Sequence, residues 1–124
     1  MALTKKTPAT IKGDLTIKAQ GEQHNLLLTY KNYSQDVYDQ FAKNEANFKR
    51  PDALPDDIPD FRYANAQLVL FLVESFDDGT DKDFPLTVDG LIELDSYWPG
   101  ALIGIVQGYH QARAASVEGN SKRR

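Results

Sequence analysis

The sequence predicts a single α+β domain, mainly α-helical, that begins with a β-hairpin and continues with about four helices. Between residues 10 and 30, apolar and polar residues alternate on both sides of Gly21, which is the period of two paired strands. After residue 34, apolar residues recur instead at helical spacing, behind residues that cap helices. A chain of 124 residues is long enough for one hydrophobic core and too short for two. We therefore place one globular domain at residues 10–117.

The hairpin is predicted over residues 10–30. Alternate positions are apolar in both of its strands: Ile11, Leu15, Ile17 and Ala19 in the first, and Leu26, Leu28 and Tyr30 in the second. Gly21-Glu22 provides the turn between them. An isolated hairpin is at best marginally stable in water, so another element must pack on its apolar face.

The helices are predicted over residues 34–48, 62–76, 87–95 and 99–117. Ser34 and Thr87 are suitable N-caps for the first and third, and Pro99 suits the first turn of the fourth. The apolar run 68–73 fits either a buried strand or a buried helix by its period alone, and the length of the surrounding segment favours a helix. Residues 49–61 contain three prolines, which predicts an extended connection between the first two helices.

Charge is distributed unevenly along the chain. Between Glu74 and Asp95 there are eight acidic side chains against one lysine. Both ends are basic: residues 1–9 are predicted to be a disordered tail, and residues 118–124 a basic flexible tail. The net charge of -4 argues against binding to nucleic acid, which requires Lys and Arg to neutralise phosphates. No apolar run is long enough to cross a membrane, and no secretory signal is present, so we expect a cytoplasmic protein.

The sequence contains no recognisable catalytic equipment. His24 and His110 are far apart and do not have the spacing of metal ligands. The acidic run at residues 77–83 does not fit a calcium-binding EF-hand loop, because aligning Gly79 places Phe76 where an oxygen ligand is required. We therefore expect no enzymatic activity, no metal and no cofactor.

Small residues recur at every fourth position of the last predicted helix: Gly100, Gly104, Gly108, Ala112 and Ser116. A glycine inside a helix costs about 1 kcal/mol relative to alanine, so this stripe indicates that another segment approaches the helix closely. The favoured neighbour is the preceding apolar helix of the same chain, and the alternative is a second subunit.

We infer that the chain acts by binding other proteins. The candidate protein-binding residues combine the single tryptophan, the small-residue stripe, the basic end and the acidic loop: Trp98, Gly100, Gly104, Gly108, Ala112, Lys122, Arg123, Arg124, Asp77, Asp78, Asp81 and Asp83. An acidic centre and basic ends on one chain also predict self-association head to tail, as a homo-oligomer that closes into a ring or continues as an open spiral.

The C-terminal half contains a series of segments in a distinctive order: Phe84-Pro85-Leu86-Thr87, Leu91-Ile92-Glu93-Leu94, Trp98-Pro99-Gly100-Ala101-Leu102, Gly108-Tyr109-His110-Gln111-Ala112-Arg113 and Ser116-Val117-Glu118-Gly119-Asn120-Ser121-Lys122. This order resembles the tail assembly chaperones of long-tailed, siphovirus-like bacteriophages. The apolar segment 66–76 also fits the family, whereas the N-terminal hairpin is less distinctive.

The resemblance implies a protein made in the infected bacterial cell that binds the tape measure protein, keeps it soluble and recruits subunits of the major tail tube protein. Such a protein is absent from the mature virion, and a longer product is often made by a translational frameshift. Two other hypotheses remain: a small acidic inhibitor that binds a basic host or phage protein, and a metal-dependent hydrolase that uses the acidic loop.

Overall fold

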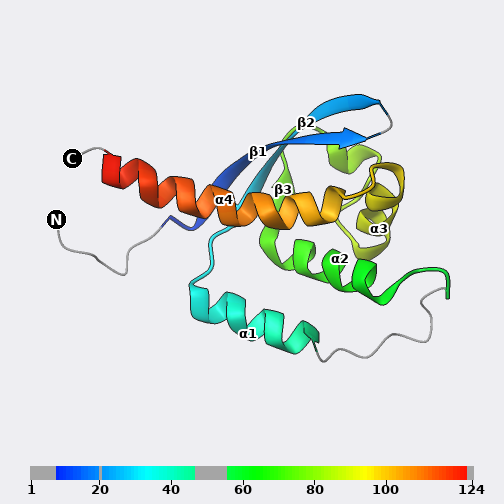
Figure 1. Ribbon diagram of the computed structural model, residues 1–124, viewed down its shortest axis with the longest axis horizontal. Coiled ribbons are helices and arrows are strands. Elements are labelled where there is room, and N and C mark those ends of the chain that lie inside the picture. Colours follow the sequence, from blue (N-terminus) through cyan, green and yellow to red (C-terminus); the bar gives the residue numbers. More distant parts are fainter. Residues whose placement is uncertain (1–7, 20, 47–55, 123–124) are drawn as a thin grey trace.

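A computed structural model describes residues 8–19, 21–46 and 56–122, and it confirms an α+β domain with an N-terminal hairpin and four α-helices (Figure 1). In chain order the elements are β1 (Thr10–Ala19), β2 (Glu22–Lys31), α1 (Gln35–Ala46), α2 (Asp60–Leu72), β3 (Val73–Phe76), the short 3-10 helix η1 (Thr80–Lys82), α3 (Val88–Tyr97) and α4 (Ala101–Lys122).

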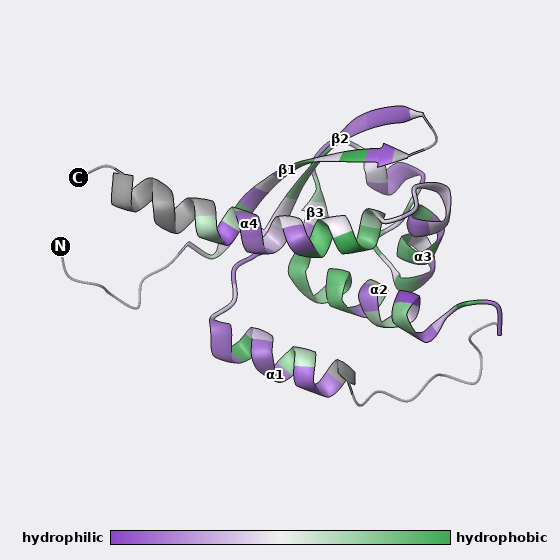
Figure 2. Ribbon diagram, in the orientation of Figure 1, coloured by the Kyte–Doolittle hydropathy of each residue, from purple (hydrophilic) through white to green (hydrophobic). Residues whose placement is uncertain are grey.

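The three strands form one antiparallel sheet in the order β1-β2-β3. The predicted hairpin is confirmed, and its register pairs Ile11 with Tyr30 and Ile17 with His24. This register places the alternating apolar residues on one face, because partners in a ladder share a face. Helix α4 crosses that face, and α2 and α3 pack against α4 (Figure 1). Figure 2 shows hydrophobic residues concentrated on α2, whereas α1 is mostly hydrophilic.

The second predicted helix ends four residues too late. Helix α2 stops at Leu72, and residues 73–76 form the strand β3 without any intervening loop. Val73 pairs with Tyr30 while Ser75 pairs with the adjacent Thr29, so Glu74 is an extra residue in a β-bulge. The bulge turns both Val73 and Phe76 into the core, where their exposed fractions are 1% and 7%. Two buried residues three positions apart have the spacing of one face of a helix, and this is why the sequence wrongly predicted that the helix continues to residue 76.

The last helix is longer than predicted. It starts at Ala101 and continues to Lys122, so residues 118–122 are helical and not part of a flexible tail. These residues include no proline, and a single glycine lowers helix stability by only about 1 kcal/mol. Gly100 has φ +89°, a left-handed conformation that glycine adopts readily, and therefore precedes the helix together with Pro99.

Other predicted boundaries differ in smaller ways. Both helix caps are confirmed, because the Val37 N–H donates to Ser34 Oγ at 3.4 Å and the Gly90 N–H donates to Thr87 Oγ1 at 3.0 Å. Pro8 and Ala9 were predicted to be disordered, but the backbone carbonyls of both accept hydrogen bonds from Asn32. The predicted connection over 49–61 ends two residues too late, since Asp60 already begins α2, and only residues 56–59 of it are described outside a helix. The predictions for residues 1–7, 47–55 and 123–124 lie outside the described residues.

Tyr30 is the centre of the contact between the sheet and α4. Its side chain is completely buried, and its hydroxyl donates a hydrogen bond to the backbone carbonyl of Ile105 at 2.7 Å. The ring lies against two glycines: a Cβ added to Gly13 would be 2.5 Å from the ring, and one added to Gly108 would be 2.8 Å from the hydroxyl. Both glycines therefore make room for one tyrosine.

Asp95 joins three helices at the other end of α4. Its carboxylate accepts a hydrogen bond from the Leu102 N–H at 3.2 Å and pairs with the Arg62 Nε of α2 at 3.1 Å. Gly100 has no side chain that could cap α4, so the carboxylate from α3 takes over that role. The start of α4 is thereby fixed against both α2 and α3.

Helix α1 is attached to the body through aromatic rings. The Phe71 ring of α2 stacks on Tyr33 at 4.1 Å and on Phe41 at 4.0 Å, both nearly parallel. Tyr38 of α1 stacks on Tyr109 of α4, and its hydroxyl is 3.1 Å from His110 Nε2. Contacts between aromatic rings therefore attach α1 to the rest of the domain, although the surface of α1 is mostly polar.

Candidate protein-binding groove

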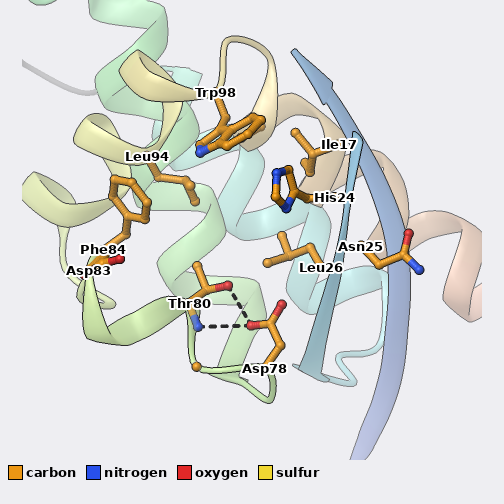
Figure 3. A pocket seen from close by; sticks show the side chains of 12 residues that line it. Ile17, His24, Asn25, Leu26, Asp78, Thr80, Asp83, Phe84, Leu94 and Trp98 are labelled. Atoms are coloured by element: carbon orange, nitrogen blue, oxygen red, sulfur yellow. Dashed lines mark hydrogen bonds between the residues drawn. The ribbon is translucent and has the colours of Figure 1, made fainter. Parts of the chain in front are cut away.

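An open groove of about 410 Å³ lies between the hairpin, the loop that carries η1, and α3 (Figure 3). Half of its lining residues are apolar, and they come from the hairpin, the loop after η1, α3 with the residue that follows it, and the start of α4: Ile17, Leu26, Phe84, Leu94, Trp98 and Ala101. The polar lining consists of His24, Asn25, Asp78, Gly79, Thr80 and Asp83. An apolar cavity with a few polar groups at its rim is the usual form of a binding site in proteins. We call this cavity the Trp98 groove.

Trp98 and His24 form one wall of the Trp98 groove. Their ring centroids are 4.7 Å apart, with the rings edge to face at 72°. The imidazole Nε2 also lies 3.2 Å from the Glu22 carboxylate. Trp98 follows α3 directly, and its backbone N–H donates to the Leu94 carbonyl at 2.8 Å. This bond fixes the backbone from which the indole projects, and the indole contacts the imidazole and remains only partly buried.

Asp78 supplies a fixed negative charge at the rim. One carboxylate oxygen accepts from the N–H and the hydroxyl of Thr80, at 3.1 and 2.6 Å, and the other accepts from the Leu27 N–H at 3.2 Å. Partial burial by itself would raise the pKa of Asp78, but these hydrogen bonds outweigh it and the pKa is lowered. Asp78 is therefore ionised at neutral pH.

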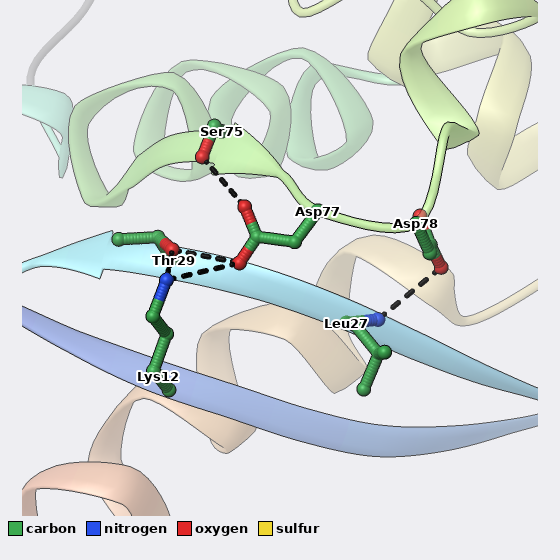
Figure 4. A network of polar contacts seen from close by, with 6 residues as sticks. All are labelled: Lys12, Leu27, Thr29, Ser75, Asp77 and Asp78. Carbon is green, nitrogen blue, oxygen red and sulfur yellow. Dashed lines mark hydrogen bonds and ion pairs between the residues drawn. The ribbon is translucent and has the colours of Figure 1, made fainter.

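Asp77 has a different position, on the outer face of the sheet (Figure 4). Its carboxylate accepts hydrogen bonds from Thr29 Oγ1 at 2.7 Å and Ser75 Oγ at 2.9 Å, and Lys12 Nζ lies at 3.4 Å. The hydrogen bonds from Thr29 and Ser75 lower the pKa of Asp77, and Lys12 adds to the effect. One carboxylate thus links all three strands, and Asp77 stabilises the sheet and does not line the groove.

The structure separates the candidate residues predicted from sequence into several groups. It brings Trp98, Asp78 and Asp83 together around the Trp98 groove. Asp81 is exposed in the same loop but outside the lining. The side chain of Lys122, and both Arg123 and Arg124, lie outside the described residues.

The small-residue stripe faces the hairpin, so the prediction that it packs on the preceding helix is wrong. A Cβ added to Gly108 would be 2.9 Å from Leu15 of β1, and one added to Gly104 would be 3.9 Å from Ile17. Gly100 does not belong to the stripe, because it precedes α4 and a Cβ there would meet nothing within 4 Å. Ala112 is partly buried against the core. The sheet and α4 lie this close together because the Tyr30 side chain fills the space between them and only a glycine leaves room for it.

Sequence analysis missed the residues that form most of the groove. In the sequence, His24 enters only as a histidine without metal-ligand spacing, Ile17 only as an apolar residue of the hairpin, and Phe84 and Leu94 only within the segments that carry the resemblance. One signal was present: a turn at Gly21 already pairs Ile17 with His24 and places them on the same face. No local pattern links this pair to Trp98.

The described lining of the groove combines apolar and aromatic side chains with one imidazole and two carboxylates. Within the described ranges, no three His, Asp or Glu side chains lie close enough together to hold a metal ion. No helix in the described part of the chain has the length and apolar character needed to cross a membrane. Comparisons with models of known protein families, with curated proteins and with solved structures find no match to this chain.

Proposed function

We propose that the chain is a tail assembly chaperone of a long-tailed bacteriophage and that the Trp98 groove binds the tape measure protein. In this role it keeps the long tape measure protein soluble in the infected bacterial cell, recruits major tail tube subunits and is absent from the mature virion. The observation that carries the proposal is the position of the groove. Trp98, which forms part of one wall, belongs to one of the segments that carry the resemblance, and Phe84 and Leu94 belong to two others.

The chemistry of the groove suits this role. A chaperone of an elongated, aggregation-prone protein needs an apolar surface that remains open in the folded state. Partly buried aromatic side chains such as Trp98 and Phe84 contribute most to protein-binding surfaces, because they bury a large area while losing little conformational freedom.

The acidic inhibitor is the weaker alternative. That hypothesis needs the aspartates of residues 77–83 to form one charged surface. Asp77 is bound by Thr29 and Ser75 on the outer face of the sheet, whereas Asp83 lines the groove. The aspartates therefore do not present one continuous surface to a basic partner.

Co-expression with the tape measure protein tests the proposal. We expect the tape measure protein to remain in the soluble fraction and to co-purify with the chain, and we expect Trp98→Ala to abolish both effects. Phe61→Ala is the matched control, because Phe61 is an aromatic residue on α2 with 61% exposure that does not line the groove. Circular dichroism must show that both variants are folded. A tape measure protein that is insoluble with the parent chain would contradict the function, and full activity of Trp98→Ala would contradict the site.

A further inference from the structure

The lining of the Trp98 groove carries an excess of negative charge. Its described lining includes two carboxylates, Asp78 and Asp83, and neither lysine nor arginine. The Asp78 carboxylate accepts three hydrogen bonds from the protein. In the described part of the chain, the exposed Asp83 carboxylate has no hydrogen-bond or ion-pair partner. A fixed charge and an unpaired charge of the same sign therefore border the apolar walls.

We infer that the Trp98 groove binds peptide segments that are both apolar and basic, with a Lys or Arg side chain of the partner paired to Asp83. Apolar side chains of such a segment cover Ile17, Phe84 and Trp98, which are the partly buried apolar residues of the lining. The cationic end of a long side chain reaches the rim, since Lys and Arg bury their aliphatic stems and keep the charge in water. An acidic segment of equal apolarity is repelled by both carboxylates. This inference rests on the proposed role of the groove in binding the tape measure protein and specifies which segments of it are bound.

The protein carries its own reporter for this site. Trp98 is the only tryptophan in the chain, and it lines the groove. Its fluorescence therefore responds to occupation of the groove, while basic peptide bound elsewhere on this acidic protein leaves it unchanged. Two synthetic twelve-residue peptides serve as probes, one built from leucine and lysine and the other with glutamate at every lysine position. Neither contains an aromatic residue.

We expect the Leu/Lys peptide to shift the Trp98 emission in a saturable way and the Leu/Glu peptide to leave it unchanged. Raising the salt concentration should weaken binding without abolishing it, because salt screens the ion pair and leaves the apolar contact intact. Equal binding of the two peptides would show that the groove binds apolar segments whatever the sign of their charge. No change of emission with either peptide would overturn the inference altogether.

Asp83→Asn and Asp81→Asn form a matched pair of variants. Both remove one negative charge from the same exposed loop, but only Asp83 lines the groove. An exposed ion pair contributes little, so we expect Asp83→Asn to weaken binding of the Leu/Lys peptide by up to about fivefold and Asp81→Asn to have a smaller effect. Equal effects would show that the charge acts at long range and that Asp83 does not contact the peptide.

Peptide binding and co-expression, both measured on the parent chain, separate this inference from the proposed function. In co-expression with the tape measure protein, a chain that solubilises its partner but binds neither peptide retains the proposed function and loses only the preference for basic segments. A chain that binds the Leu/Lys peptide but leaves the tape measure protein insoluble retains a peptide-binding groove and loses the proposed partner.

Discussion

The hydroxyl of Tyr30 donates a hydrogen bond to the carbonyl of Ile105, in the middle of α4 and 2.7 Å away. Because a helix carbonyl already accepts from its own helix, this bond uses the second lone pair of the oxygen. It places the tyrosine hydroxyl against Gly108 and ties the sheet to one position along α4. Burial also raises the pKa of Tyr30, so the hydroxyl remains a donor throughout the physiological range.

Substitution of Gly104 and Gly108 in α4 by alanine should have opposite effects. Gly104→Ala should stabilise the protein by up to about 1 kcal/mol, because alanine favours the helix and its Cβ would lie at an ordinary contact distance of 3.9 Å from Ile17. Gly108→Ala should destabilise it by about 1–3 kcal/mol, because the Cβ would be 2.8 Å from the Tyr30 hydroxyl and 2.9 Å from Leu15. Urea denaturation of both variants measures the difference. If Gly108→Ala leaves the midpoint unchanged or raises it, Gly108 is not closely packed.

Removal of the Asp95 carboxylate should loosen the start of α4. Asp95→Ala loses the hydrogen bond from Leu102 and the ion pair with Arg62, for which we expect a loss of about 2 kcal/mol in unfolding free energy. Asp95→Asn should cost less, since the amide oxygen can still accept from Leu102. Asp89→Ala, at an exposed position of the same helix α3, is the control for a general change in charge. A parent-like urea midpoint for Asp95→Ala would contradict the capping role.

Asp77 should make stability depend on pH in the acid range. Its pKa in the folded protein lies below the ordinary value, so the folded state favours the ionised form. The stabilisation is therefore complete above the ordinary aspartate pKa of about 3.9 and is lost as the pH falls through the folded value. Thermal denaturation of Asp77→Asn from pH 7 to pH 2 should show a shallower decline below pH 4 than the parent. Asp81→Asn, which changes a carboxylate for which the described structure gives no partner, should follow the parent curve. A decline as steep in Asp77→Asn as in the parent would exclude this contribution.

Phe71 should control the attachment of α1. Phe71→Leu keeps an apolar side chain but removes two stacked ring contacts, with Tyr33 and Phe41, each of which is worth roughly 0.5–1.5 kcal/mol beyond simple burial. We expect hydrogen exchange of the α1 amides to accelerate while the amides of β2 keep their protection. Exchange that accelerates equally in both elements would show that α1 unfolds only together with the core.

Local patterns predicted the hairpin and two helix caps. Alternation around Gly21 determines the pairing of Ile17 with His24, and Thr87 caps its helix by a contact three residues away. The strand β3 could not be predicted in this way. Its bulge at Glu74 gives Val73 and Phe76 the spacing of a helix, and only the pairing with β2 distinguishes the two.

The sequence predicted some residues of the candidate site but not how they come together. Composition identified the acidic loop and the single tryptophan, but the contact between Trp98 and His24 joins residues far apart in sequence, and no local rule relates them. The glycine stripe correctly indicated a close neighbour, yet the residue that needs the space is Tyr30, on a strand. Spacing within one helix shows that a small surface exists and does not show what covers it.

The direct junction between α2 and β3 limits how the length of this chain can change during evolution. A loop absorbs an inserted or deleted residue, but Leu72 ends a helix and Val73 begins a strand with nothing between them. Loss of the bulge residue Glu74 would restore a regular strand and turn either Val73 or Phe76 out of the core. The number of residues from Leu72 to Phe76 is therefore as much a part of the fold as their identity.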